Sequence, residues 1–186
     1  MRARRSGRWS DVTGHDRDAS IPVFTDDYLM LWFNHGSHPS GAAYSYVLLP
    51  NRTAQAVASY ASSPDVVVIA NTASVQAAKK PSLGIVAANF WADGPGSADL
   101  ISTSAPSSVI ICASGRSLCV GVSDPTQTGT DYLTVTLGRG AEALVSADPG
   151  VTVVQLSPTI VLRVDIAGSL GRAFQAAFDV KPESGR

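Results

Sequence analysis

Short apolar runs and alternating apolar and polar positions recur along the 186-residue chain, with polar turn residues between them. Residues 66–71 form a nearly continuous apolar run. Residues 131–137 alternate, which places Leu133, Val135 and Leu137 on one face of an extended segment. Both patterns are typical of β-strands.

The second half of the chain predicts one strand after another, with Gly, Pro, Asp and Ser in the connections. Regular spacing of short strands, without intervening long helical patterns, predicts an all-β fold of antiparallel sheets packed as a sandwich. The expected strands are residues 66–71, 74–80, 83–91, 108–114, 117–123, 131–137, 141–147, 151–156, 159–167 and 172–180.

The first third of the chain has a different pattern. Residues 1–27 are mostly polar and predict irregular structure. Two apolar segments, 28–33 and 43–49, flank a polar connection rich in Gly and Pro, so they predict a wide β-hairpin. Residues 51–62 follow with Ala, Gln and Val, and they predict a short helix that Thr53 caps.

Composition and charge argue against several classes of function. Hydrophobic residues make up 45% of the chain, charged residues 16%, and the net charge is −1. This balance does not indicate a nucleic-acid-binding protein. No apolar run is long enough for a membrane helix, and no apolar segment follows the basic N-terminus, so neither a membrane span nor a signal peptide is expected.

Two cysteines lie in one predicted hairpin. If Gly115 and Arg116 form its two-residue turn, Cys112 and Cys119 stand directly opposite each other, because their numbers are equally far from the turn. The pair can form a cross-strand disulfide, or it can remain two free, buried thiols. A metal site is not expected, because every histidine lies far upstream: His15, His35 and His38.

Three segments resemble one enzyme family and occur in its order. They are HGSHPSGAAYSYVLLP at 35–50, VIANTASVQAAKKPSLGIVAANFW at 68–91, and VSDPTQ at 122–127. The chain is similar to the C-terminal part of family 8 polysaccharide lyases, which act on hyaluronate, chondroitin and xanthan. The resemblance implies two domains: residues 1–65 as the end of a large antiparallel β-supersandwich, and residues 66–186 as a smaller C-terminal antiparallel β-sandwich.

The resemblance also implies a reaction. Members of this family are extracellular enzymes that cleave uronic-acid-containing polysaccharides by β-elimination. They use Asn, His and Tyr side chains on an N-terminal helical domain, and this sequence has no counterpart of that domain. We therefore expect the chain to be inactive alone, with no catalytic residue, cofactor or metal. Its expected partners are a polysaccharide of glycosaminoglycan or xanthan type and the helical catalytic domain.

The weak candidates for substrate contact are His35, His38 and Trp91. The two histidines share a loop with Asn34, and an indole face can stack on a sugar ring. Turn histidines more often shape the backbone, and packing is the better expectation for all three tryptophans, including Trp9 and Trp32. The alternative to a lyase part is a stand-alone carbohydrate-binding or adhesion sandwich; a purely structural sandwich is a further rival.

Overall fold

A computed structural model of the protein describes residues 2–8 and 25–182, and for residues 2–8 and 25–30 it describes the backbone alone. The chain divides into two compact units, Met1–Leu48 and Leu49–Arg186. Nearly all regular structure is antiparallel β-sheet, so the predicted all-β class is confirmed. The predicted domain boundary near residue 65 stays a prediction.

The first unit contains a two-stranded sheet. Strand β1 (Arg2–Arg8) pairs antiparallel with β2 (Thr25–Leu31). The predictions for this region were wrong in two ways. The arginine-rich start is a strand, not an irregular arm, and residues 43–49 form no strand. Strand β2 therefore pairs with β1 and not with the segment 43–49 that the predicted hairpin gave it.

The helix prediction is confirmed. Helix α2 (Ala54–Ser62) begins after Thr53, whose side-chain oxygen accepts a hydrogen bond from the Ala56 backbone N–H at 3.2 Å. This bond satisfies one of the amide groups that the first helical turn leaves without a partner. None of the nine helix residues is fully buried, so α2 lies on the surface of its unit.

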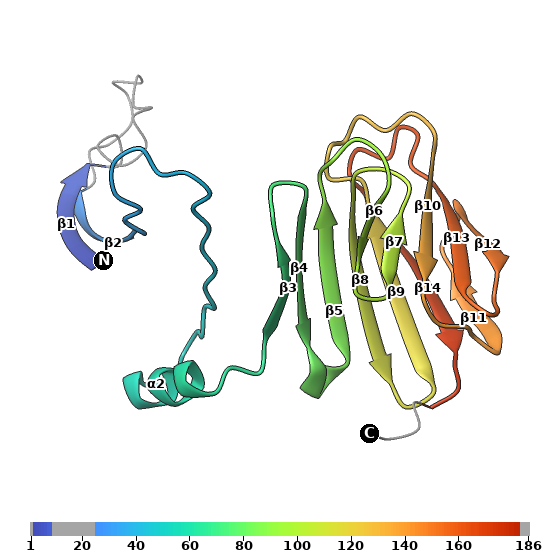
Figure 1. Ribbon diagram of the computed structural model, residues 1–186, viewed down its shortest axis with the longest axis horizontal. Helices are drawn as coiled ribbons and strands as arrows, with labels where there is room; N and C mark the ends of the chain where they lie inside the picture. The colour runs from blue at the N-terminus through green and yellow to red at the C-terminus, as the bar shows by residue number, and fades with distance from the viewer. Residues whose placement is uncertain (1, 9–24, 183–186) are drawn as a thin grey trace. The chain divides into compact units, whose positions relative to one another are not determined.

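The second unit is a sandwich of two antiparallel sheets, which face each other in Figure 1. The strand order of one sheet is β11 (Ala143–Ala147), β14 (Phe174–Asp179), β9 (Ser117–Ser123), β8 (Ser107–Ser114), β5 (Ile85–Phe90), β4 (Val75–Lys80) and β3 (Val67–Asn71). The other has the order β12 (Val151–Gln155), β13 (Ile160–Asp165), β10 (Tyr132–Leu137), β7 (Ile101–Thr103) and β6 (Gly96–Ala98).

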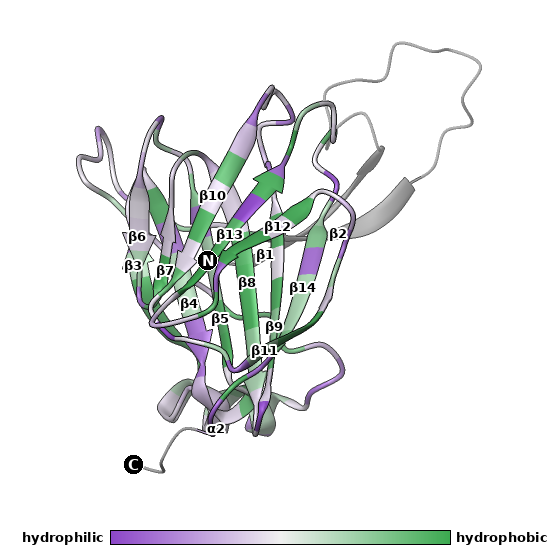
Figure 2. Cartoon of the chain, turned by 90° about the vertical axis from the view of Figure 1, so that its right-hand side faces the viewer, coloured by the Kyte–Doolittle hydropathy of each residue, from purple (hydrophilic) through white to green (hydrophobic). Residues whose placement is uncertain are grey.

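Alternation along the strands builds the core between the two sheets. On β10 and β13 every second residue is buried, and Figure 2 shows the corresponding alternation of apolar and polar bands. Burial of these apolar side chains is the main favourable term in folding. The largest fully buried ones are Phe90, Phe178, Ile101, Leu118, Leu133, Leu137, Ile160, Leu162, Val120, Val135, Val164 and Val180.

The cysteine hairpin has the predicted register. Cys112 pairs with Cys119 across β8 and β9, and Gly115 takes a φ of 57° at the first turn position. Both residues are free thiols and both are exposed, so the alternative of buried thiols was wrong. Their side chains lie on the outer face of the sheet, because the residues next to them in sequence, Ile111 and Leu118 among them, are buried.

We expect Cys112 and Cys119 to form a disulfide when the protein folds under oxidising conditions. Directly opposite residues of an antiparallel pair have Cα atoms about 4.5–5.5 Å apart, within the range that a disulfide spans. Closing this short loop stabilises the fold by roughly 2–3 kcal/mol in the chain-entropy model. Titration of thiols in the unfolded, unreduced protein measures the pairing, with a reduced sample as control. Two titratable thiols in the oxidised sample would refute it.

Candidate functional site

Exposed aromatic rings gather in the first unit around one of the predicted candidates. Phe33 stacks on Tyr44 with ring centroids 4.8 Å apart, and Tyr44 stacks on Tyr46 at 6.3 Å. His35 lies 6.2 Å from the Tyr44 ring. The side-by-side packing expected for the two tyrosines is confirmed, although they do not lie on a strand. The stack brings the segments on either side of the loop together by their rings.

The loop between these rings has a shape that its turn residues determine. The Gly36 N–H donates to Asn34 Oδ1 at 2.9 Å, a local turn that an Asn side chain often forms. Gly36, His38 and Gly41 all have positive φ. Among the described residues, His38 joins no aromatic pair, so His35 and His38 are not assembled into one catalytic group. Both remain exposed candidates for substrate contact.

Trp32 and Trp91 are both more exposed than tryptophans packed in a core would be. Trp32 is 42% exposed, so the expectation that it lies in the core was wrong. Trp91 is 45% exposed, yet its indole N–H donates to Gln76 Oε1, and the Gln76 amide in turn donates to the Thr72 carbonyl at 2.6 Å. Trp91 is therefore a solvent-facing ring with a defined orientation. Trp9 lies outside the described residues.

The VSDPTQ segment organises a loop after β9. Its aspartate, Asp124, is 2% exposed and accepts hydrogen bonds from the Thr126 N–H at 2.8 Å and the Gly129 N–H at 2.8 Å. The Thr126 hydroxyl also donates to it at 2.6 Å. Burial raises the pKa of Asp124, but these hydrogen bonds outweigh burial, so the pKa lies below its usual value. The carboxylate holds the loop and is not available to a substrate.

The KKPSLG segment forms the turn between β4 and β5. A short 3₁₀ helix, η1 (Pro81–Leu83), ends at Gly84, whose φ is 62°. Asp65 forms an ion pair with Lys80 and accepts a hydrogen bond from the Ser82 hydroxyl at 3.1 Å. The hydrogen bond from Lys80 lowers the pKa of Asp65. These contacts attach the chain that precedes β3 to the end of the sheet.

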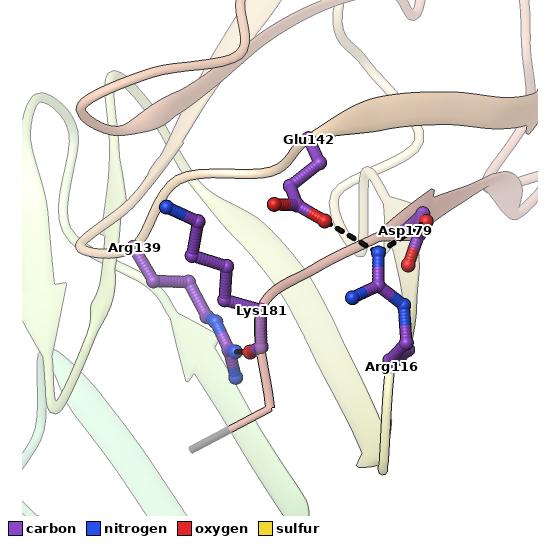
Figure 3. A network of polar contacts seen from close by, with 5 residues as sticks. All are labelled: Arg116, Arg139, Glu142, Asp179 and Lys181. Carbon is purple, nitrogen blue, oxygen red and sulfur yellow. Dashed lines mark hydrogen bonds and ion pairs between the residues drawn. The ribbon is translucent and has the colours of Figure 1, made fainter. Parts of the chain in front are cut away.

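Charged side chains meet at the end of the sandwich near the C-terminus (Figure 3). Arg116, in the turn between β8 and β9, forms ion pairs with Glu142 and with Asp179, the latter at 2.8 Å. The hydrogen bonds that Arg116 donates to Asp179 and to Glu142 raise its pKa above the usual value. Arg139 donates to the Lys181 carbonyl at 3.1 Å. Because Arg116 is 54% exposed, solvent screens the cluster and its stabilising effect is small.

The described residues supply few groups for chemistry. Among them, no three or more His, Cys, Asp or Glu side chains are grouped to hold a metal ion. No helix within the described ranges has the length and apolarity needed to cross a membrane. Abstraction of a proton from carbon needs a positioned base and a group that stabilises the resulting charge. The exposed rings around His35 can stack on a ligand, but they do not form such an arrangement.

Two domain families match the chain in sequence. The super-sandwich domain of polysaccharide lyase family 8 matches residues 1–61. The C-terminal β-sandwich domain of the same family matches residues 67–132. The predicted motifs at 35–50, 68–91 and 122–127 all lie within these matched ranges.

Similar proteins include lyases with different named substrates. A xanthan lyase from Bacillus sp. (strain GL1) is 42% identical over 96% of this chain and 19% of its own length. A hyaluronate lyase from Thermasporomyces composti is 35% identical over 95% of this chain and 22% of its own length. The structure of a Streptomyces coelicolor A3 chondroitin AC lyase in complex with chondroitin sulphate is similar with a TM-score of 0.79, at 31% identity, over 97% of this chain and 24% of that one. The chain thus spans about a fifth of the length of the curated relatives it matches.

Proposed function

The chain belongs to polysaccharide lyase family 8, and we propose that it forms the C-terminal β-domains of an extracellular enzyme that cleaves uronic-acid-containing polysaccharides by β-elimination. The observation that carries this proposal is the match of two successive domains of one lyase family, in order, along the chain. Hyaluronan, chondroitin and xanthan are the candidate substrates, after the names of the similar proteins.

Within that enzyme, residues 1–65 would complete the super-sandwich domain and residues 66–186 would form the C-terminal sandwich. Exposed apolar side chains in the first unit support an extended packing surface there. Phe33, Tyr44 and Tyr46, whose rings are in contact, are each between 51% and 64% exposed. Contiguous exposed apolar surface of this kind is characteristic of an interface. We propose that further β-strands of the large domain cover it.

The proposed role of this chain is to support the fold and the substrate cleft, while a helical domain performs proton transfer. Elimination from a uronate requires a group that neutralises the carboxylate and a base that removes the adjacent proton, held together in one geometry. His35 lies in an exposed loop and contacts other aromatic rings, which provides neither requirement. The helical domain of the same enzyme is therefore the proposed catalytic partner.

We expect the 186-residue chain alone to produce no unsaturated uronate from xanthan, hyaluronan or chondroitin, as followed by ultraviolet absorbance. A chimaera tests the supporting role directly. In it, this chain replaces the matching C-terminal part of the Bacillus xanthan lyase, to which it is 42% identical. The chimaera should cleave xanthan, because the donor enzyme supplies the catalytic groups.

Two controls complete this test. The Bacillus enzyme truncated before the replaced part should lose most activity, which would assign the supporting role to the β-domains. His35→Ala and His38→Ala in the isolated chain test the opposite view. Turnover by the isolated chain that disappears in either variant would make the loop an active site and refute the proposal. An inactive but folded chimaera would also count against it.

A further inference from the structure

A row of uncharged polar side chains crosses the outer face of the seven-stranded sheet. Strand register places each member opposite the next, across β3, β4, β5, β8 and β9. Buried core residues alternate with them along the strands, so the row faces away from the other sheet. Adjacent strands lie about 4.8 Å apart, so the row is ~19 Å long. We call it the polar strip: Asn71, Gln76, Asn89, Ser108 and Ser123.

Hydrogen bonds give the side chains of Gln76, Asn89 and Ser108 in the polar strip defined orientations. Ser108 Oγ donates to Asn89 Oδ1 at 2.7 Å. Among the described residues, none accepts a hydrogen bond from the Asn89 amide nitrogen, so this donor faces solvent on an exposed residue. Gln76 accepts from the Trp91 indole and donates to the Thr72 carbonyl. Donors and acceptors held in this way lose little conformational entropy when a ligand binds.

Trp91 stands beside the strip on the same face. Its backbone N–H donates to the Ser74 carbonyl at 2.8 Å, which extends the ladder between β4 and β5 by one step. Phe90 points into the core and is 1% exposed, so the next residue projects outward, as Asn89 does. The indole N–H reaches Gln76 diagonally across the two strands, and the ring remains 45% exposed. An oriented, accessible indole face therefore flanks the strip.

The neighbouring row of the same face is flat. Ala78, Ala87, Ile110 and Gly121 follow one another across β4, β5, β8 and β9. A Cβ at Gly121 would lie 3.0 Å from Ile110 Cγ2, so the glycine leaves room for that side chain to lie across the sheet. No side chain in this row is longer than isoleucine, and none carries a charge. A long ligand can thus approach the polar strip along its length.

We propose that the polar strip and Trp91 form a binding surface for a polysaccharide chain. Amide and hydroxyl groups in a row match the donors and acceptors of sugar hydroxyls, and an indole face stacks on a pyranose ring. Neither row contains a carboxylate that would repel uronates. The length of ~19 Å favours a run of several sugar rings over one monosaccharide.

A protein partner fits this face less well. The cores of protein interfaces are usually more apolar, with few rows of small polar groups. Here the exposed aliphatic side chains Val68 and Ile110, at 49% and 45% exposure, are separated by two alanines of the row, so they do not form one apolar core. The class of ligand rests on the proposed function, but the position of the surface rests on register, exposure and hydrogen bonds alone.

Binding of the intact 186-residue chain to soluble xanthan, hyaluronan and chondroitin sulphate tests the inference, by affinity electrophoresis and calorimetry. Trp91→Ala should weaken binding roughly tenfold or more, as loss of a central aromatic contact does. Tyr132→Ala is the matched control. Tyr132 is 47% exposed and lies on the five-stranded sheet, so its removal should leave binding unchanged.

A second variant keeps the test decisive if Trp91→Ala unfolds the protein. Asn89→Asp has nearly the same shape and adds one negative charge to the strip, so it should weaken binding of these anionic polymers, and high salt should reduce the difference. Thermal melting verifies that each variant is folded. No binding by the wild-type chain, or equal binding by Asn89→Asp and Tyr132→Ala, would overturn the proposal. An active chimaera without binding would refute this surface alone, while binding with an inactive chimaera would refute the proposed function alone.

Discussion

Replacing Gly84 with alanine is expected to destabilise the C-terminal sandwich by more than about 3 kcal/mol, enough to unfold a marginal domain. A Cβ at this position would lie 2.0 Å from the carbonyl oxygen of Ala113 and 3.0 Å from its carbonyl carbon. These are backbone atoms at the end of β8, so no side-chain rotation relieves the clash. The backbones at Gly84 and Ala113 cannot move apart without losing the hydrogen bond from the Ala113 N–H to the Gly84 carbonyl, at 2.9 Å.

Gly115→Ala is the matched control for this prediction. Gly115 has a φ of 57°, close to the 62° of Gly84, but a Cβ there meets nothing within 4 Å. Alanine at position 115 therefore causes only the strain of placing a side chain in the left-handed backbone region, about 1–2 kcal/mol. Urea unfolding followed by circular dichroism measures both variants against the wild type. If the two alanines cost the same free energy, close approach of the strands is not the reason for glycine at position 84.

Local signals explain what the sequence predicted well. The ten expected strands from residue 66 onward all correspond to observed strands, because short apolar or alternating runs between turn residues are local signals of a strand. The Thr53 cap was predictable since it concerns residues three apart in sequence. The pairing of Cys112 with Cys119 followed from the two-residue turn between them, since a tight turn determines hairpin register.

Non-local pairing explains what the sequence did not predict. Strand β1 is rich in arginine and becomes a strand because β2 supplies its ladder. Strands β6 and β7 have three residues each, in a segment rich in Gly, Pro and Ser, and such short runs carry no measurable period. The apolar segment 28–33 predicted that Trp32 packs within a strand, but β2 ends at Leu31 and Trp32 is 42% exposed.

The same contrast between local signals and non-local pairing applies to the candidate sites. The motif residues that suggest the family, such as Asp124 and Gly84, turn out to shape turns and loops. Their positions were visible in the sequence, while their structural roles were not. The polar strip could not be found by spacing along the chain, because its members come from five strands. It becomes visible only once the register of each strand pair is known.

Asp124→Ala is expected to lower the stability of the sandwich by roughly 2–3 kcal/mol, within the range for losing hydrogen bonds to a charged group and leaving buried donors without an acceptor. The carboxylate accepts from the backbone N–H groups of Thr126 and Gly129 and from the Thr126 hydroxyl. Alanine would leave these donors in a site where the native residue is 2% exposed. Asp124→Asn keeps the shape but replaces one acceptor oxygen with a donor, so we expect an intermediate loss.

The pH dependence of the unfolding free energy distinguishes a charged hydrogen-bond acceptor at Asp124 from a side chain that only fills space. Because hydrogen bonds hold the pKa of Asp124 below its ordinary value of 3.8, the charged form stabilises the folded state. This contribution is fully present above the unfolded pKa and is lost as the pH falls through the lower, folded pKa. The stability difference between wild type and Asp124→Asn should therefore be constant near neutrality and narrow below about pH 4. Urea unfolding across that range measures it. A difference that stays constant down to acid pH would show that the loop depends on the shape of Asp124 and not on its charge.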